Sequence, residues 1–348
     1  MEEHGAAHER PQGTRLDPSP AQTSVDPRAL ILCYHRIAEV LTDPHSLCVT
    51  PQCFAEQLGL LRQHTQPMQL SQLVRALRHG NLPRRAVVIT FDDGYADTLY
   101  QAKPLLEHYD LPANAFVTAG CLNMKREMWW DELEHLFLQP GTLPERLSVT
   151  INGNVHAWDL REAAYYSEDD FLRHASWTME SRDSPHFRQR LFRILHQLVL
   201  PLPEVERRQI LNQLWKWSEA HPAARPAHRP LSPDELVRLA EGTLIEVGAH
   251  SVTHPVLPKL PLDQQREEIR GSKTAIEKIV GHPVTTFAYP FGARSPETVA
   301  LVQDAGYECA CISFDDVVFR STDRFQLPRT CVGNWDGDTF QHQLGLRV

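Results

Sequence analysis

Short apolar runs alternate along this chain with longer stretches in which apolar residues recur at helical spacing. A short continuous apolar run is typical of a buried strand, and spacing of about three to four residues is typical of an amphipathic helix. We expect strands at 29–34, 86–90, 114–117, 244–247, 286–289 and 308–312. We expect helices at 51–64, 71–79, 98–109, 233–241, 261–280 and 295–305. This order predicts an α/β fold with a parallel sheet covered by helices, either open or closed into a barrel.

Two of the predicted helices have clear capping residues at their start. Pro51 suits the first position of a helix, where its missing N–H costs nothing, and Thr50 can cap that helix. Ser232 can cap the helix predicted at 233–241 in the same way.

The stretch 124–229 interrupts the strand–helix alternation. It contains six of the seven tryptophans, has a mainly helical pattern and has proline-rich ends. We interpret it as a helical Trp-rich insertion in one domain that spans 29–348, preceded by a disordered polar segment at 1–28. Its tryptophans would add to the core. Alternatively, Trp129 or Trp130 would line a sugar-binding groove, since sugars present CH faces that stack on indole.

The composition narrows the class of protein. Lys plus Arg number 35 and Asp plus Glu number 44, and the net charge of −9 disfavours a general nucleic-acid binder, which would show a basic surface. Hydrophobic residues make up 42% of the chain, and this much apolar surface excludes a disordered protein. No apolar run approaches the ~18 residues that a membrane-spanning helix needs.

The cysteines and the first residues bear on the cellular compartment. The seven cysteines are irregularly spaced and form no CxxC pair, so neither a disulfide framework nor a zinc ribbon is indicated. Residues 1–28 contain no apolar core of a signal peptide. We therefore expect a cytoplasmic protein with reduced thiols. No obligate protein partner is inferred from the sequence.

Acids and histidines follow two of the predicted strands. Asp92 and Asp93 come directly after the strand at 86–90, and burying such a pair is costly unless a partner or metal compensates the charge. His250 and His254 follow the strand at 244–247. An Asp-Asp-Gly surface turn and a chance histidine pair are the simpler explanations of each motif alone. In a β/α barrel, however, both segments would meet at the carboxyl edge, where sites form.

Taken together, these residues supply two histidines and one aspartate as metal ligands, with one acid left over. Three protein ligands with an open fourth position are the arrangement of a hydrolytic metal site. Such an ion polarises a carbonyl and activates water, and the spare acid can accept a proton.

Four motifs resemble those of the polysaccharide deacetylase family, also known as the NodB-homology group or carbohydrate esterase family 4. They are TFDDGY at 90–95, HSVTH at 250–254, FAYPFG at 287–292 and LCYHRI at 32–37. The last is similar to the Tyr-His branch, which includes poly-N-acetylglucosamine deacetylases. The resemblance covers roughly 29–120 and 230–335, and the segment between them lies outside it. It implies a distorted parallel (β/α)7 barrel with a mainly helical insertion.

The resemblance also implies roles for individual residues. Asp92 resembles the general base, and Asp93, His250 and His254 resemble the ligands of one divalent metal ion. Zinc is the first expectation for that ion, with cobalt, nickel or manganese as alternatives. Substrate or oxyanion contacts are implied for the motif residues Tyr95, Tyr289, Pro290 and Phe291, with the backbone N–H near Phe291 as the oxyanion donor.

The chain departs from the family pattern in two places. The arginine that usually opens the third motif is missing, because Phe287 and Ala288 stand in that region, and Arg329 is the candidate replacement. The late histidine that usually acts as general acid is also missing from residues 325–335. In the Tyr-His branch the acid is thought to come from the first strand, so His35 is the candidate here.

The expected function is metal-dependent hydrolysis of an N-acetyl group on a carbohydrate, either a polysaccharide or a sugar precursor. An O-acetyl ester or a non-sugar amide is the alternative substrate on the same fold. A non-haem iron oxygenase also uses two histidines and a carboxylate, but it leaves Asp92 without a role. A degenerate binding module without turnover is a further alternative, weakened by the presence of both acids and both histidines.

Overall fold

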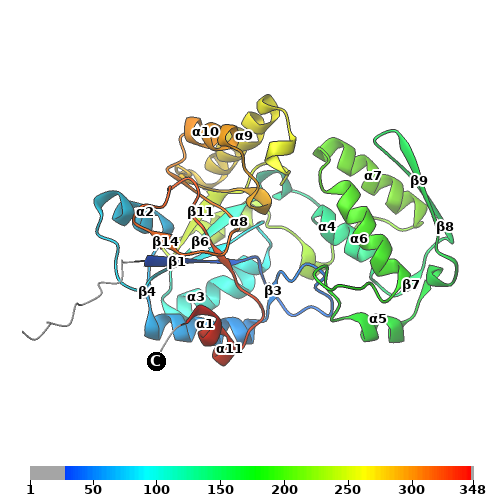
Figure 1. The fold of residues 1–348 in the computed structure, drawn as a ribbon, viewed down its shortest axis with the longest axis horizontal. Helices are drawn as coiled ribbons and strands as arrows, with labels where there is room; N and C mark the ends of the chain where they lie inside the picture. The colour runs from blue at the N-terminus through cyan, green and yellow to red at the C-terminus, as the bar shows by residue number, and fades with distance from the viewer. Residues whose placement is uncertain (1–27, 346–348) are drawn as a thin grey trace, which may run out of the picture.

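A computed structural model describes residues 28–345 of the chain (Figure 1). The segment predicted to be disordered, 1–28, lies outside the described residues except for Arg28, which begins the first strand. Six parallel strands form the centre, in the order β13, β12, β11, β6, β5, β1. Their bounds are β1 Arg28–Tyr34, β5 Ala86–Phe91, β6 Ala113–Val117, β11 Ile245–Ala249, β12 Thr286–Ala288 and β13 Cys309–Cys311.

A short segment near the C-terminus closes this sheet. Leu327 forms a parallel bridge with Cys311 of β13, and β15 (Thr330–Cys331) pairs in parallel with β1. Residues 327–331 therefore act as a seventh strand between the first and last strands of the sheet. The prediction of a distorted (β/α)7 barrel is confirmed, and the closing strand is the part that the hydrophobic pattern did not indicate.

Two shorter strands extend this sheet at its N-terminal side. Strand β14 (Val318–Phe319) pairs antiparallel with the start of β1, and β4 (Gln66–Pro67) pairs with the start of β5.

The helices predicted around the sheet are present, and Figure 1 shows them on its outer side. Thr50 caps the first of them by accepting a hydrogen bond from the N–H of Cys53, and Ser232 and Glu235 form a reciprocal capping box at another. The helix predicted at 98–109 opens with a π-helical turn, Thr98–Ala102. The helices are α1 Pro51–His64, α2 Leu70–His79, α3 Lys103–Tyr109, α8 Pro233–Ala240, α9 Leu262–Val280, α10 Pro296–Asp304 and α11 Gly337–Leu344, of which α11 was not predicted.

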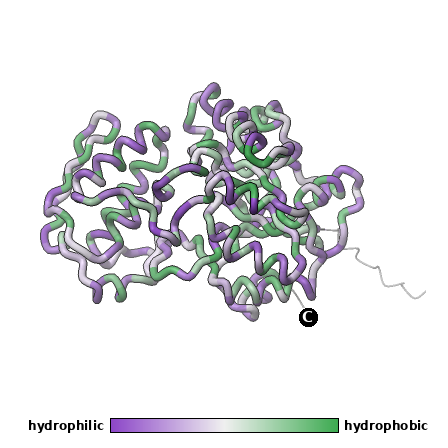
Figure 2. The backbone as a smooth tube through the Cα atoms, turned by 180° about the vertical axis from the view of Figure 1, so that it is seen from behind, coloured by the Kyte–Doolittle hydropathy of each residue, from purple (hydrophilic) through white to green (hydrophobic). Residues whose placement is uncertain are grey.

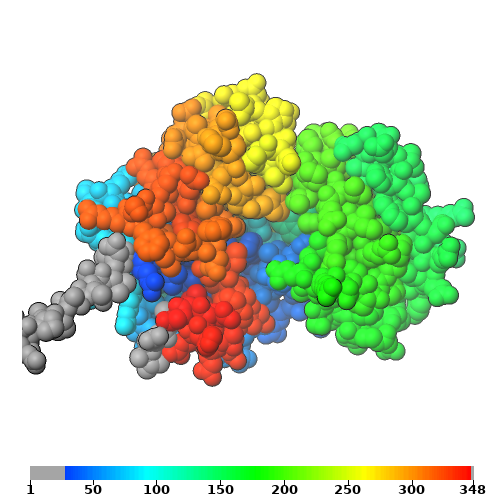
Figure 3. Space-filling model, viewed as in Figure 1, coloured from blue at the N-terminus to red at the C-terminus, as the bar shows by residue number. Residues whose placement is uncertain are grey.

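The stretch from α4 to α7 forms a lobe beside the barrel, coloured green in Figures 1 and 3. Its side chains form a hydrophobic cluster separate from that of the barrel, with Trp129, Trp130 and Trp215 buried in it. The lobe contains α4 Trp129–Phe137, α5 Glu168–His174, α6 Phe187–Val199, α7 Glu204–Trp217, and the strand pair β7 Gly141–Thr142 with β10 Tyr165–Tyr166.

The lobe also contains a hairpin that was not predicted. Strand β8 (Arg146–Ile151) pairs antiparallel with β9 (Asn154–Asp159) across Asn152 and Gly153, both of which have positive φ. Alternate residues of β8 are buried. An Asn-Gly pair after strict alternation is a strong hairpin signal, so this element was available from the sequence.

A parallel pair of short strands lies at the mouth of the barrel. Strand β2 (Arg36–Ile37) continues from β1 and pairs with β3 (Cys48–Val49), so the loop between them is held at both ends. Hydropathy along the backbone follows the same architecture, with hydrophobic stretches gathered in the interior of both parts (Figure 2). Within residues 28–345, no helix combines the length and apolar character needed to cross a membrane.

Candidate active site

A tight turn after β5 positions the two aspartates at the mouth of the barrel. The N–H of Asp92 still donates to the Tyr34 carbonyl at 2.9 Å, as a continuation of the ladder between the strands. The backbone then reverses, with φ of 72° at Asp93 and 88° at Gly94. A Cβ at Gly94 would lie 2.8 Å from Cγ1 of Val117, so only glycine fits there. Both carboxylates are buried, although each is at the end of a strand.

The two histidines after β11 converge on Asp93. The Nε2 atoms of His250 and His254 lie 3.1 Å apart, and they lie 3.6 and 3.3 Å from Oδ1 of Asp93, respectively. Nδ1 of His250 is 2.8 Å from the carbonyl of Ala288, so this nitrogen carries the proton and Nε2 keeps a lone pair. His254 is held in a left-handed conformation with φ of 54°, which turns its ring toward His250.

These three residues fit a divalent cation. Ligands about 2.0–2.1 Å from a tetrahedral ion lie about 3.3 Å from one another, which is close to the separations seen here. Burial lowers the pKa of His250 to about 4 and holds that of His254 well below its ordinary value, so both rings are neutral, as metal ligands must be. Burial and the Asp92 carboxylate raise the pKa of Asp93, and a cation would compensate that charge.

Asp92 has a different partner. Arg329, which is fully buried, donates from Nη1 to Oδ1 of Asp92 at 2.7 Å and from Nη2 to Oδ2 at 2.6 Å. Its Nη1 also donates to Thr90, and its Nε donates to the Ile312 carbonyl. Burial alone would raise the pKa of Asp92, but Arg329 holds it well below its ordinary value. Asp92 is therefore ionised and held in one orientation, so it can accept a proton, and Arg329 lowers its affinity for that proton.

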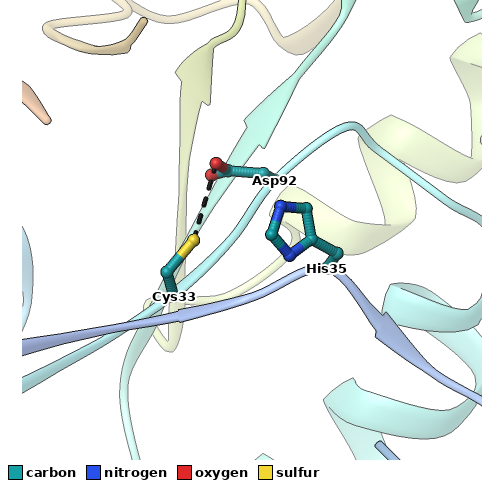
Figure 4. A group of neighbouring side chains, drawn as sticks. All are labelled: Cys33, His35 and Asp92. Carbon is teal, nitrogen blue, oxygen red and sulfur yellow. Dashed lines mark hydrogen bonds between the residues drawn. The ribbon is translucent and has the colours of Figure 1, made fainter. Parts of the chain in front are cut away.

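His35 lies beside Asp92 at the end of β1. A nitrogen of its ring, an oxygen of Asp92 and the sulfur of Cys33 all lie within 4.8 Å of one another (Figure 4). His35 also lines the same pocket of about 250 Å³ as Asp92, Asp93, His250 and His254. Burial lowers the pKa of His35, and Asp92 opposes this effect. One cavity thus contains the candidate ligands, the candidate base and the candidate acid.

Three of the residues predicted to contact substrate do not reach this pocket. The Tyr95 hydroxyl donates to Asp131 at 2.6 Å and accepts from Nε1 of Trp130, so it belongs to the core of the lobe. The Tyr289 hydroxyl donates to the Phe325 carbonyl at 3.1 Å, and Pro290 is buried. Their positions give no support to a substrate contact, because strand alternation and the lobe direct them into packed interior.

Phe291 is the member of the third motif that lines the pocket. Its backbone is left-handed with φ of 57°, its ring lies 4.5 Å from the His254 ring, and its side chain is 43% exposed. A non-glycine residue with this conformation is uncommon, and it marks a place where the surroundings fix the backbone.

The pocket has walls that the motifs did not indicate. Trp130 lines it and packs against His254 at 5.0 Å between ring centroids, whereas Trp129 lies behind it against His196. His196 and Leu200 reach the pocket from α6 and its C-terminal end, and His45 and Leu47 reach it from the loop between β2 and β3. Of the two tryptophans offered from the sequence as groove-lining residues, Trp130 lines the pocket and Trp129 does not. No sequence signal identifies His45, Leu47, His196 and Leu200, because their position depends on the packing of the lobe on the barrel.

Comparison with known proteins gives one family match. The model of the polysaccharide deacetylase family matches residues 79–181 and 212–310, together more than half of the chain. The match extends into the stretch 124–229, which the motif resemblance alone placed outside the shared part.

Relatives and solved structures agree with this match. The chain is 33% identical to poly-beta-1,6-N-acetyl-D-glucosamine N-deacetylase of Escherichia coli strain K12 over 84 residues, which are 24% of this chain and 12% of that protein. The deacetylase PplD of Streptococcus pyogenes has a TM-score of 0.56 at 17% identity, covering 91% of this chain and 98% of that one. IcaB from Ammonifex degensii has a TM-score of 0.56 at 16% identity, covering 92% and 97%. At these identities, the two structures show a shared fold.

Proposed function

The chain belongs to the polysaccharide deacetylase family, and from this premise we propose that it is a hydrolase that removes an N-acetyl group from a carbohydrate. Asp93, His250 and His254 would hold one divalent cation, with zinc as the first candidate because the set of two imidazoles and one carboxylate suits it. The observation that carries the proposal is that a three-ligand group and an ion-paired carboxylate share one pocket with His35.

The chain's own residues divide the chemistry between them. When bound, a divalent cation supplies Lewis acidity toward the acetamide carbonyl and lowers the pKa of a water. Asp92 accepts the proton of the attacking water, and Arg329 keeps it ionised and fixes its plane. The backbone N–H of Phe291 is the proposed donor to the developing oxyanion.

His35 is the proposed proton donor to the leaving nitrogen. Because the pKa of Asp92 is low, this carboxyl releases a captured proton readily, and a ring nitrogen of His35 within 4.8 Å can receive it through one water. His35 then delivers the proton as the C–N bond breaks, and the products are acetate and a free amino sugar. Trp130 would cover one face of the substrate and exclude water from the reacting atoms.

An acetate-release assay on metal-loaded protein tests the proposed function. It compares N-acetylated sugars and oligomers with O-acetyl esters of the same sugars. Acetate release from the amides supports the proposal. Release from the esters alone would replace it with an esterase, and no release from any member of the panel would favour a binding module.

The proposed metal ligands give the first prediction. His254→Ala should reduce the bound metal from about one ion per chain to a small fraction, because two ligands seldom hold an ion tightly. Elemental analysis after dialysis measures this. The matched control is His282→Ala, which removes an exposed histidine and should keep the ion. Full occupancy in the His254 variant would show that the ligand set is wrong.

The proposed acid gives the second prediction. His35→Ala should keep the ion and the fold but lower kcat by about 10², at the lower end of the worth of a positioned acid. KM should change little, since His35 is proposed to act on the leaving nitrogen. Substrates with a more acidic leaving group should recover part of the loss. An equal loss for activated and ordinary leaving groups would argue against the acid role, and the exposed His79→Ala serves as control.

A further inference from the structure

A second group of possible metal ligands consists of Cys33, His35 and Asp92. It shares no residue with the group of Asp93, His250 and His254. Cys33 and His35 are two residues apart at the end of β1, so their side chains leave the same face of the strand. Asp92 follows β5, the neighbouring parallel strand, in which Thr90 is the register partner of Cys33. Figure 4 shows the sulfur pointing at the Asp92 carboxylate with the His35 ring beside both.

The contacts within this group suit a soft cation. Sγ of Cys33 lies 3.6 Å from Oδ2 of Asp92, close to the distance between two ligands of one tetrahedral ion. A sulfur, an imidazole nitrogen and a carboxylate oxygen are ligands that zinc accepts, and the sulfur favours thiophilic ions such as cadmium. Hydrogen bonding with Cys331 and burial raise the pKa of Cys33, so its thiol keeps its proton until a cation displaces it.

We propose that Cys33, His35 and Asp92 form a second cation site, which takes a thiophilic divalent ion and inhibits the enzyme when filled. On binding, the S–H bond of Cys33 breaks, a sulfur–metal bond forms and one proton leaves to solvent. No electron is transferred, so neither an oxidant nor a reductant is needed. The binding stands on the geometry alone, whereas the inhibition rests on the function proposed above.

Charge makes this site the weaker of the two. Arg329 already donates to both oxygens of Asp92, so an ion must share Oδ2 with a guanidinium. Oδ2 of Asp92 is also only 3.9 Å from Nε2 of His250, so ions in the two sites would be close neighbours and repel each other. The second site therefore fills after the first and only with excess cation.

Filling the second site would disable the proposed chemistry directly. The ion would occupy a lone pair of Asp92, the proposed base, and a ring nitrogen of His35, the proposed acid. Activity should rise as the first equivalent of zinc binds and then fall with excess zinc. Manganese, which prefers oxygen ligands, should inhibit much less at the same excess.

Titration of the metal-free full chain with Co²⁺, under a thiol-free reductant, tests the binding. A cobalt ion bound to a thiolate adds a charge-transfer absorption in the near ultraviolet, which a site of two histidines and an aspartate does not produce. We expect this band only after the first equivalent. Cys33→Ser should abolish it, and Cys331→Ser, which changes the register partner of Cys33 on β15, should keep it.

Two outcomes of this titration would overturn the proposal. They are no band in the unchanged chain and a band that persists in Cys33→Ser, and loss of that persisting band in Cys331→Ser would assign the thiolate to Cys331 instead. If Cys33→Ser does not fold, His35→Ala provides the second test. It should weaken binding of the ion that produces the band without removing a core side chain. His254→Ala should retain the band, so loss of the first site and loss of the second are distinguishable.

Inhibition is measured separately. The zinc concentration that halves the activity should rise at least about tenfold in Cys33→Ser, since even the partners that merely orient a metal ligand are worth 10–100-fold in affinity. An unchanged zinc dependence would refute the inhibitory role. If no acetate is released at any zinc concentration, the proposed function fails while the cobalt band still reports on the second site.

Discussion

Asp92→Asn should lower kcat by about 10²–10⁴ while the protein keeps its fold and its metal ion, because a positioned base contributes that much. The amide has the same shape as the carboxylate but cannot accept the proton of water. Asp92 contributes no atom to the group of Asp93, His250 and His254, so binding of the ion should survive. Steady-state kinetics with elemental analysis of the same sample measures both effects.

Asp93→Asn is the matched comparison, because it makes the same carboxylate-to-amide replacement at the neighbouring residue. It should lose metal affinity first, and its activity should return in part at high metal concentration. If Asp92→Asn loses the ion and Asp93→Asn keeps it, the roles of the two acids are reversed. If both variants keep activity, neither carboxylate is part of the chemistry.

Arg329→Met should destabilise the fold by about 3–5 kcal/mol, the cost of breaking a buried ion pair from one side. Arg329 is fully buried and makes two charge-assisted hydrogen bonds to Asp92. Its removal therefore leaves the buried Asp92 carboxylate without a charged partner. Denaturant unfolding of the metal-free protein measures the change. Arg324→Met, an exposed arginine on the same segment, should change stability by less than about 0.5 kcal/mol.

The double variant Asp92→Asn with Arg329→Met should recover part of this loss, since it leaves no unpaired buried charge. Strict additivity of the two single changes would show that the ion pair carries no coupling energy.

Lowering the pH should reduce the difference in unfolding free energy between Arg329→Met and the unchanged chain. Arg329 depresses the folded-state pKa of Asp92, so the stability it contributes is present above the unfolded-state pKa of ~3.9 and is lost as pH falls toward the folded-state value. The variant, whose Asp92 has a higher pKa, lacks this contribution at neutral pH. A difference in unfolding free energy that stays constant from neutral to acid pH would contradict the linkage.

Local pattern was sufficient for most of the barrel. Each of the six central strands is a short apolar run; they are β1, β5, β6, β11, β12 and β13. The helices α1 and α8 begin directly after their capping residues, Thr50 and Ser232. These features depend on residues within one or two turns of each other. The two segments that carry the proposed metal ligands were also identified from local pattern, because acids and histidines that directly follow buried strands are unusual in any context.

Elements with weak local signals were missed or assigned only by resemblance. The closing strand β15 has two residues and no apolar run, so its pairing with β1 is visible only in the structure. Tyr95 and Tyr289 lie in motifs next to residues with proposed roles in the site, yet their side chains enter packed interior. Membership in a motif fixes neither the direction of a side chain nor its hydrogen-bond partner.

The sequence by itself determined the strand–helix order, the two segments that carry the proposed metal ligands and the carboxyl edge at which they meet. The tertiary structure decided which distant residues complete the site. Arg329 was named beforehand only through the family resemblance, and it reaches Asp92 across 237 positions of the chain because residues 327–331 close the barrel between β13 and β1. His196 reaches the pocket because α6 packs within the lobe against α4. Such contacts arise from barrel closure and packing of the lobe, and periodicity along the chain carries no information about either.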